Sequence, residues 1–153
     1  MQAIEKRDKL VVSNSHTIEK RDLGKIVIFS TVTLGIYGIL LIAKWTDDVN
    51  FLLGKQKHEK IVIVVVSVVT IGIALAVWEI IFAYDIQNYT EKIRLKERSK
   101  NLGGTVLGLT LFAYALAFAS GGLAFILSMA FGIYASCLVQ KELNIIADEM
   151  SVL

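Results

Sequence analysis

Long apolar runs separated by charged segments are the main pattern of this chain. Residues 102–140 contain no Lys, Arg, Asp or Glu over 39 consecutive positions. A bilayer core about 30 Å thick needs about 20 helical residues, so an uncharged run of 18 or more predicts a membrane helix. As one helix this run would reach about 58 Å. We therefore expect it to fold back on itself or to extend far outside the lipid.

The turn within this run is predicted at residues 119–122, Ala-Ser-Gly-Gly. A glycine pair interrupts helices, because glycine accepts positive φ without a steric penalty. The turn divides the run into helices at about 103–118 and 123–140. The alternative is one long third helix, part of which lies in the membrane interface.

Two earlier apolar runs predict two further membrane helices, at about 24–44 and 61–83. The β-branched residues from Ile61 to Ile71 would suggest a strand in a soluble protein, but the uncharged run continues to Trp78. An open strand in lipid would leave its backbone groups unpaired, so we expect a helix. The predicted fold class is all-α, a polytopic transmembrane bundle with four spans, or three in the alternative.

Charged residues gather beside and between these helices. The predicted organisation is a cytoplasmic polar N-terminal tail (1–23), a transmembrane helical domain (24–140) and a short C-terminal tail (141–153). Lys and Arg number six up to residue 25, four in 44–60, five in 85–101 and one after residue 140. Four spans divide them 12 to 4, and the positive-inside rule then places both termini in the cytoplasm. Three spans divide them 11 to 5 and keep the N-terminus inside.

Composition agrees with a membrane location and excludes several classes of site. Hydrophobic residues make up 55% of the chain, above the roughly 45–50% of soluble domains, and the mean hydropathy is +0.62. The net charge of +2 is too small to favour a nucleic-acid partner. His16 and His58 lie far apart, and Asp47 and Asp48 have no third acid nearby, so we expect no metal site and no cofactor. The two aspartates read as a solvated helix end.

A motif in the first apolar run carries a family resemblance. It runs from Thr33 to Ile39 (Thr-Leu-Gly-Ile-Tyr-Gly-Ile) and ends in the polar residues 46–50. A weaker copy lies at 70–74, followed by Trp78, and residues 131–134 are similar to a third element. The chain resembles the small multi-pass membrane proteins of domain of unknown function family 4234, which repeat a Thr-x-Gly-Ile-Tyr core. The resemblance implies a membrane location and no particular chemistry.

The two motif copies are 37 residues apart, which places Asp48 opposite Asp85 in the alignment of one copy with the other. Helices that cross the membrane in opposite directions would make this an inverted repeat, as in transporters. One helix per repeat is too little for alternating access, so a channel or transporter would need self-assembly.

Glu79 is the candidate functional acid, because it is the only acid within the apolar body of a predicted span. An ionisable group at membrane depth is a functional hypothesis by default. The alternative is a carboxylate that reaches the interface beside Trp78. Trp45 and Trp78 fall at opposite ends of their predicted spans and are expected to be interface anchors.

Small residues predict where helices pack closely, since they let helix backbones approach one another. The third predicted span is rich in them and is expected to be the central helix or an oligomer face. The candidate packing positions are Gly35, Gly38, Gly72, Gly104, Gly108, Ala113, Ala117 and Gly121.

These features predict a multi-pass protein of the cell membrane and no enzyme, because no catalytic set of residues is present. We expect it to act by helix–helix association, as an accessory, scaffold or structural membrane component. Its partners would be the lipid bilayer and either further copies of itself or another membrane protein, and not a nucleic acid. One alternative is an oligomeric small channel or transporter, and another is a membrane-embedded coat or envelope component.

Overall fold

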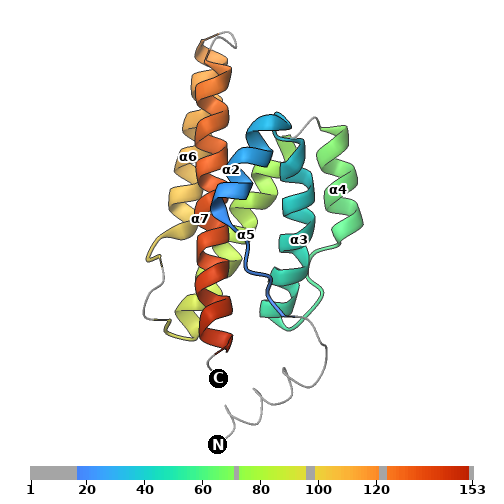
Figure 1. Cartoon of the computed structure of the whole chain (residues 1–153), viewed down its shortest axis with the longest axis vertical. Helices are drawn as coiled ribbons and strands as arrows, with labels where there is room; N and C mark the ends of the chain where they lie inside the picture. Colours follow the sequence, from blue (N-terminus) through green and yellow to red (C-terminus); the bar gives the residue numbers. More distant parts are fainter. Residues whose placement is uncertain (1–16, 71–72, 96–98, 121–123, 152–153) are drawn as a thin grey trace, which may run out of the picture.

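The computed structural model describes residues 17–70, 73–95, 99–120 and 124–151 (Figure 1). Over these residues the chain is entirely helical apart from turns and loops, so the predicted all-α class is confirmed. The helices are α2 (Leu23–Val32), α3 (Ile36–Leu53), α4 (Lys60–Val69), α5 (Ile73–Lys92), α6 (Leu102–Ala119) and α7 (Phe125–Ser151).

The helices form three antiparallel pairs, α2 with α3, α4 with α5, and α6 with α7 (Figure 1). All three pairs turn at the same end of the molecule, the upper end in Figure 1. We call the end that holds Thr33, Thr70 and Ser120 the tip end. The opposite end, which holds residues 54–59 and Ser151, is called the base. The α6/α7 pair reaches farther toward the tip end than the other two pairs.

A hydroxyl side chain occupies the same place in each of the three turns. Thr33 ends α2, Thr70 ends α4 and Ser120 ends α6. Each side-chain oxygen accepts a hydrogen bond from the backbone N–H four residues later, at 2.9–3.0 Å. A hydroxyl that satisfies a free N–H at the start of a helix stabilises that start. The same side-chain chemistry therefore caps all three turns.

Two predicted spans are divided by these turns. We expected one uninterrupted helix over 24–44 and another over 61–83, and that expectation is wrong, because the helices end at Thr33 and Thr70. In the first turn Leu34 and Gly35 both have positive φ, +50° and +91°, which reverses the chain. Glycine adopts this conformation without strain.

The two motif copies are consequently related in a different way from the one expected. Each copy is a complete hairpin, and α3 and α5 both run from the tip end to the base (Figure 1). The copies are therefore parallel repeats of a helical hairpin, and the expected inverted repeat is wrong. The third element, residues 131–134, lies within the continuous helix α7.

The predicted helices at 103–118 and 123–140 correspond to α6 and α7, although α7 continues to Ser151 through most of the predicted C-terminal tail. The central helix is α5, which contacts α3, α4, α6 and α7. The third predicted span was expected to be the central helix or an oligomer face. The central position is wrong, because α6 packs only against α5 and α7 within the described part of the chain, and the oligomer face stays a prediction.

Membrane-spanning length is found in one described helix. By length and apolarity, α6 could cross a membrane, and 28% of its 18 residues are buried inside the protein. The core helix of a soluble protein would be mostly buried, so the exposure of α6 suggests membrane association. Two shorter apolar helices are present, α2 and α4. A bundle of four spans is not confirmed.

Large apolar side chains are exposed on the tip-end halves of all three pairs. No charged residue occurs in 26–43, 61–78 or 102–140. We call this exposed set the apolar tip surface: Ile28, Phe29, Val32, Leu34, Ile36, Leu40, Val65, Val66, Val68, Val69, Ile73, Val77, Leu111, Phe112, Tyr114, Phe118, Phe125, Ile126, Leu127 and Tyr134. Large exposed apolar surfaces are rare on soluble monomers and mark membrane or protein contact sites.

Candidate functional site

A buried polar network near the base joins the segment before α2 to α3 and α7. The Arg21 guanidinium donates through Nη1 to Asp48 at 2.8 Å and to Gln140 at 3.2 Å. The side chains of Arg21 and Asp48 are 8% and 2% exposed, so this ion pair is buried. The Asn144 amide accepts from the Arg21 backbone N–H and donates to its carbonyl, at 3.0 and 2.8 Å. The network fixes the N-terminal segment against α7.

Trp45 belongs to this network. Its indole N–H donates to Gln140 at 2.7 Å, and its side chain is 1% exposed. An interface anchor must reach the lipid headgroups, so the expectation for Trp45 is wrong. Because Gln140 accepts the hydrogen bond of the indole N–H, Trp45 can be buried in the core without a partner at the membrane interface. Trp78 is half-buried and packs edge-on against the His58 ring, at 5.6 Å between ring centroids.

A second polar cluster lies at the start of the α4/α5 pair. The buried carboxylate of Asp85 accepts from the Lys57 ammonium at 2.7 and 2.8 Å, and it lies 2.8 Å from the His58 Nε2. Asn50 holds the loop that carries Lys57 and His58, because its amide pairs with the backbone N–H groups of both residues and with the His58 carbonyl.

The two clusters occupy equivalent places in the two hairpins. A shift of 37 residues aligns Arg21 with His58 and Asp48 with Asp85. In each hairpin a basic residue that precedes the first helix contacts an acidic residue late in the second helix. The same shift relates Ile26 to Ile63, both fully buried. In the described residues, 21–53 and 58–90 are therefore two copies of the same structural unit.

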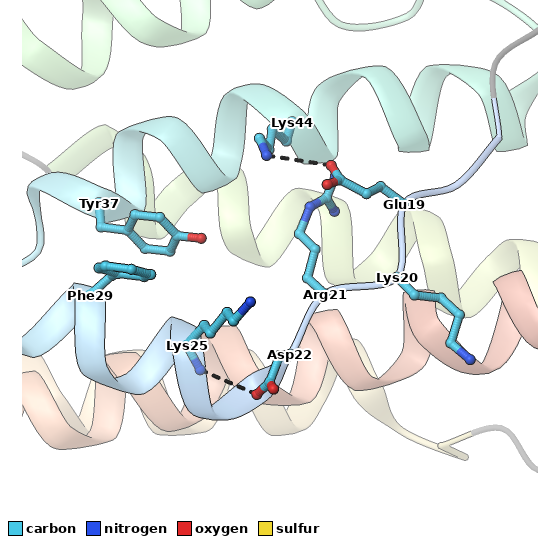
Figure 2. A pocket seen from close by; sticks show the side chains of 8 residues that line it. All are labelled: Glu19, Lys20, Arg21, Asp22, Lys25, Phe29, Tyr37 and Lys44. Atoms are coloured by element: carbon cyan, nitrogen blue, oxygen red, sulfur yellow. Dashed lines mark hydrogen bonds and ion pairs between the residues drawn. The ribbon is translucent and has the colours of Figure 1, made fainter.

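A pocket of about 210 Å³ lies beside Arg21, between α2 and α3 (Figure 2). Its lining residues are Glu19, Lys20, Arg21, Asp22, Lys25, Phe29, Tyr37 and Lys44. Figure 2 shows the Lys25 ammonium and the Tyr37 hydroxyl pointing into the same space. The Phe29 and Tyr37 rings pack together at 5.4 Å between centroids and form the apolar wall.

The charges of the pocket are only partly paired. Glu19 accepts from Arg21 at 3.2 Å and from Lys44 at 3.4 Å. Burial alone raises the pKa of the Glu19 carboxyl, but the positive charges of Arg21 and Lys44 outweigh this effect and hold the pKa below its usual value. Asp22 accepts from the backbone N–H groups of Gly24 and Lys25 and thereby caps α2. Within the described residues, no carboxylate pairs with the Lys25 ammonium.

The candidate acid Glu79 is buried between α5 and α7 and accepts a hydrogen bond from the Ser136 hydroxyl. The alternative interpretation, a carboxylate that reaches the interface beside Trp78, does not fit this position. The predicted helix end at Asp47 and Asp48 is also different from expectation. Asp47 is partly exposed and pairs with Lys60, whereas Asp48 is buried on Arg21 rather than solvated.

The candidate packing residues have different roles in the structure. Gly72 and Gly121 lie outside the described residues. Gly35 serves the turn, and a Cβ at Gly35 or Gly108 would meet nothing. A Cβ at Gly38 would make an ordinary contact with Leu75, and one at Gly104 would meet its own neighbour Asn101. On α6, Ala113 is buried and Ala117 is half-buried. The small residues of α6 therefore do not form a single packing face.

Sequence reasoning missed the glycine that does permit a close approach. A Cβ at Gly103 would collide with the ring of Tyr84 on α5. It also missed Arg21, Gln140 and Asn144, which fall in the predicted N-terminal tail, at the end of the last predicted span and in the predicted C-terminal tail. The 37-residue shift contained the signal for Arg21, because it aligns that residue with His58 ahead of an equivalent helix. No group of three or more His, Cys, Asp or Glu able to hold a metal occurs in the described part of the chain.

Comparison with known proteins adds one finding. The family described as "Domain of unknown function (DUF4234)" matches residues 21–88, slightly less than half of the chain. The match begins at Arg21 and includes Asp85, so it covers nearly all of the two equivalent hairpins, with the Arg21–Asp48 pair and the second polar cluster, but not Gln140 or Asn144. No curated protein and no solved structure shows a significant match to the chain.

Proposed function

Because this chain belongs to the DUF4234 family through residues 21–88, we propose that it is an integral membrane protein that inserts three helical hairpins from one side of the bilayer. It acts there through helix–helix association as a structural, scaffold or accessory component. The observation that carries this proposal is the separation of the apolar tip surface from the polar network at the base. Burying one large apolar side chain is worth about 1.5–3 kcal/mol, so lipid is the favoured surrounding for the tip end.

The helix lengths support two different insertion depths for the three hairpins. The helices α2 and α4 have 10 residues each, or about 15 Å, which is about half of a bilayer core. The 18 residues of α6 reach about 27 Å and match the whole core. In this proposal the first two hairpins are re-entrant and α6/α7 crosses the membrane. The four predicted spans thus become two, with two half-depth hairpins beside them.

The first turn suits an apolar surrounding. Lipid offers no hydrogen bonds, so backbone groups at that depth need partners within the protein. Every backbone N–H from Thr33 to Gly38 donates to a carbonyl or to the Thr33 hydroxyl, all within the α2/α3 hairpin. A turn whose backbone N–H groups are all hydrogen-bonded within the hairpin can lie inside the hydrocarbon core.

The distribution of charge supports the orientation. All 16 Lys and Arg fall in the four charged segments, and insertion of the three tips would leave these segments on one side. The positive-inside rule then places the base and both termini in the cytoplasm. All 16 Lys and Arg would then lie on one side of the membrane, a stronger asymmetry than the 12-to-4 division of the four-span arrangement.

Single-cysteine labelling tests this arrangement. In a Cys137→Ser background, we expect Lys55→Cys and Lys92→Cys to react with an impermeant maleimide from the same, cytoplasmic, side of sealed vesicles. Both positions lie near the base. The four-span arrangement places residues 55 and 92 on opposite sides, so labelling from opposite sides would overturn the hairpin proposal.

Two further positions report depth. Leu34→Cys should be protected from both sides, because its turn lies within the lipid, whereas Ser120→Cys should react from the outside. Ser151→Cys serves as the matched cytoplasmic control. Resistance of the protein to alkaline extraction from its membrane is required in all variants.

An oligomeric small channel or transporter is the second proposal, and the buried Glu79 is the observation in its favour. In the structural reading, Glu79→Gln keeps a partner for the Ser136 hydroxyl and should leave proton and cation flux unchanged in reconstituted vesicles. A flux that is present in the natural protein and lost in the variant would favour the channel. The conservative variant Glu79→Asp, which keeps a carboxylate, should then retain part of the flux.

The partner is also a proposal, either further copies of this chain or another membrane protein. Native mass spectrometry of the complex released from its own membrane separates these two cases. A coat or envelope component would have the same geometry and a far higher copy number, which quantitative proteomics of the membrane would measure.

A further inference from the structure

We propose that the pocket between α2 and α3 binds the phosphate group of an anionic phospholipid. The inference rests on the proposed insertion of the hairpins, because it uses the depth at which the pocket would lie. Lys25 is the last charged residue before the apolar part of α2, and Lys44 is the first after the apolar part of α3. Both line the pocket. The pocket therefore lies at the boundary between charged and apolar surface, where lipid phosphates are found.

The chemistry of the lining fits an anion with an apolar tail. Four cations and two carboxylates line the pocket. Three of the cations are paired: Arg21 with Glu19 and Asp48, Lys44 with Glu19, and Lys20 with Asp148 outside the pocket. Asp22 is engaged by the start of α2, so Lys25 is the lining cation without a carboxylate partner among the described residues. The Lys25 ammonium and the Tyr37 hydroxyl can both donate to phosphate oxygens in the space they share (Figure 2). The Phe29 ring continues from the pocket toward the apolar tip surface, along which an acyl chain could lie.

Comparison with the second hairpin indicates that these side chains are not needed for folding. At the shift of 37 residues, the positions of Lys25, Phe29, Tyr37 and Lys44 are taken by Val62, Val66, Ala74 and Ile81. The second hairpin has the same hydroxyl cap, at Thr70, and an equivalent buried pair without them. The polar side chains are a property of the first hairpin alone, which indicates a ligand.

The test compares spin-labelled phosphatidylglycerol with spin-labelled phosphatidylcholine on the full chain in phosphatidylcholine vesicles. We expect the natural protein to prefer the anionic lipid. The double variant Lys25→Val with Lys44→Ile, which copies the second hairpin, should reduce that preference about five-fold for each lysine. Tyr37→Phe, which removes only a hydroxyl, should give a smaller reduction in the same direction.

The control is a double variant of two exposed lysines away from the pocket, Lys55→Val with Lys141→Ile. An equal loss in this control would overturn the proposal, because it would show attraction to net charge alone. Displacement of the anionic lipid by inorganic phosphate at millimolar concentration would assign the pocket to a free anion instead. Failure of the protein to float with vesicles of either composition would overturn the proposed function itself, a result distinct from insertion without lipid preference.

Discussion

Replacing Asp48 with Asn is expected to lower the free energy of unfolding by about 3 kcal/mol, whereas the same change at its neighbour Asp47 should lower it by less than about 1 kcal/mol. Asp48 pairs with Arg21 where both side chains are almost completely buried. Removal of the Asp48 charge leaves the buried Arg21 guanidinium with only the largely exposed Glu19 as its counter-ion, which costs stability. Asp47 pairs with Lys60, but these side chains are 43% and 47% exposed, so water and salt compensate for the loss.

Chemical unfolding in detergent micelles measures both variants, with helix content as the signal. The neighbouring positions share a helix, a side-chain type and a substitution, so the difference between them reports burial and partner. Equal losses would contradict the description of Arg21 as the centre of a buried network. The Asp48→Asn loss should also be insensitive to added salt, and the small Asp47→Asn loss should shrink with it.

Gly103→Ala and Gly108→Ala are expected to change stability in opposite directions. Alanine at Gly103 would force the Tyr84 ring to move, and overpacking of this kind costs about 1–3 kcal/mol. Alanine at Gly108 meets nothing and improves the helix propensity of α6, a gain of up to about 1 kcal/mol. Both glycines lie in α6, so thermal unfolding of the two variants in the same detergent isolates the contact with Tyr84.

The double variant Gly103→Ala with Tyr84→Ala tests the cause. Gly103→Ala should cost much less stability in the Tyr84→Ala background than in the natural protein, since the clash with the ring would no longer exist. A loss that persists without the ring would place the cause in the helix start rather than in the packing of α6 on α5.

The helical class and the turn at Ser120 were predictable from apolar length and a glycine pair. The turns at Thr33 and Thr70 were not predicted, because each lies within an apolar run of about the length that crosses a bilayer. Length and hydropathy do not distinguish one spanning helix from two short helices that fold back. The deciding information was the hydroxyl of the motif, which caps the next helix in the structure.

The polar network was hidden for a different reason. Arg21 and Asp48 are separated by 27 positions, and Gln140 and Asn144 lie at the far end of the chain. Nothing local to any of them signals burial. Their common position becomes visible only when the hairpins are folded and α7 is packed against the segment before α2.

The unequal lengths of the hairpins have a mechanical consequence for a bilayer that holds them as proposed. The leaflet next to the base would accommodate six helix cross-sections, and the far leaflet only those of α6 and α7. Such an imbalance expands one monolayer relative to the other. Many copies gathered in one region would therefore bend the bilayer, with the base on the convex side, and the protein would concentrate where the membrane is already curved in that sense.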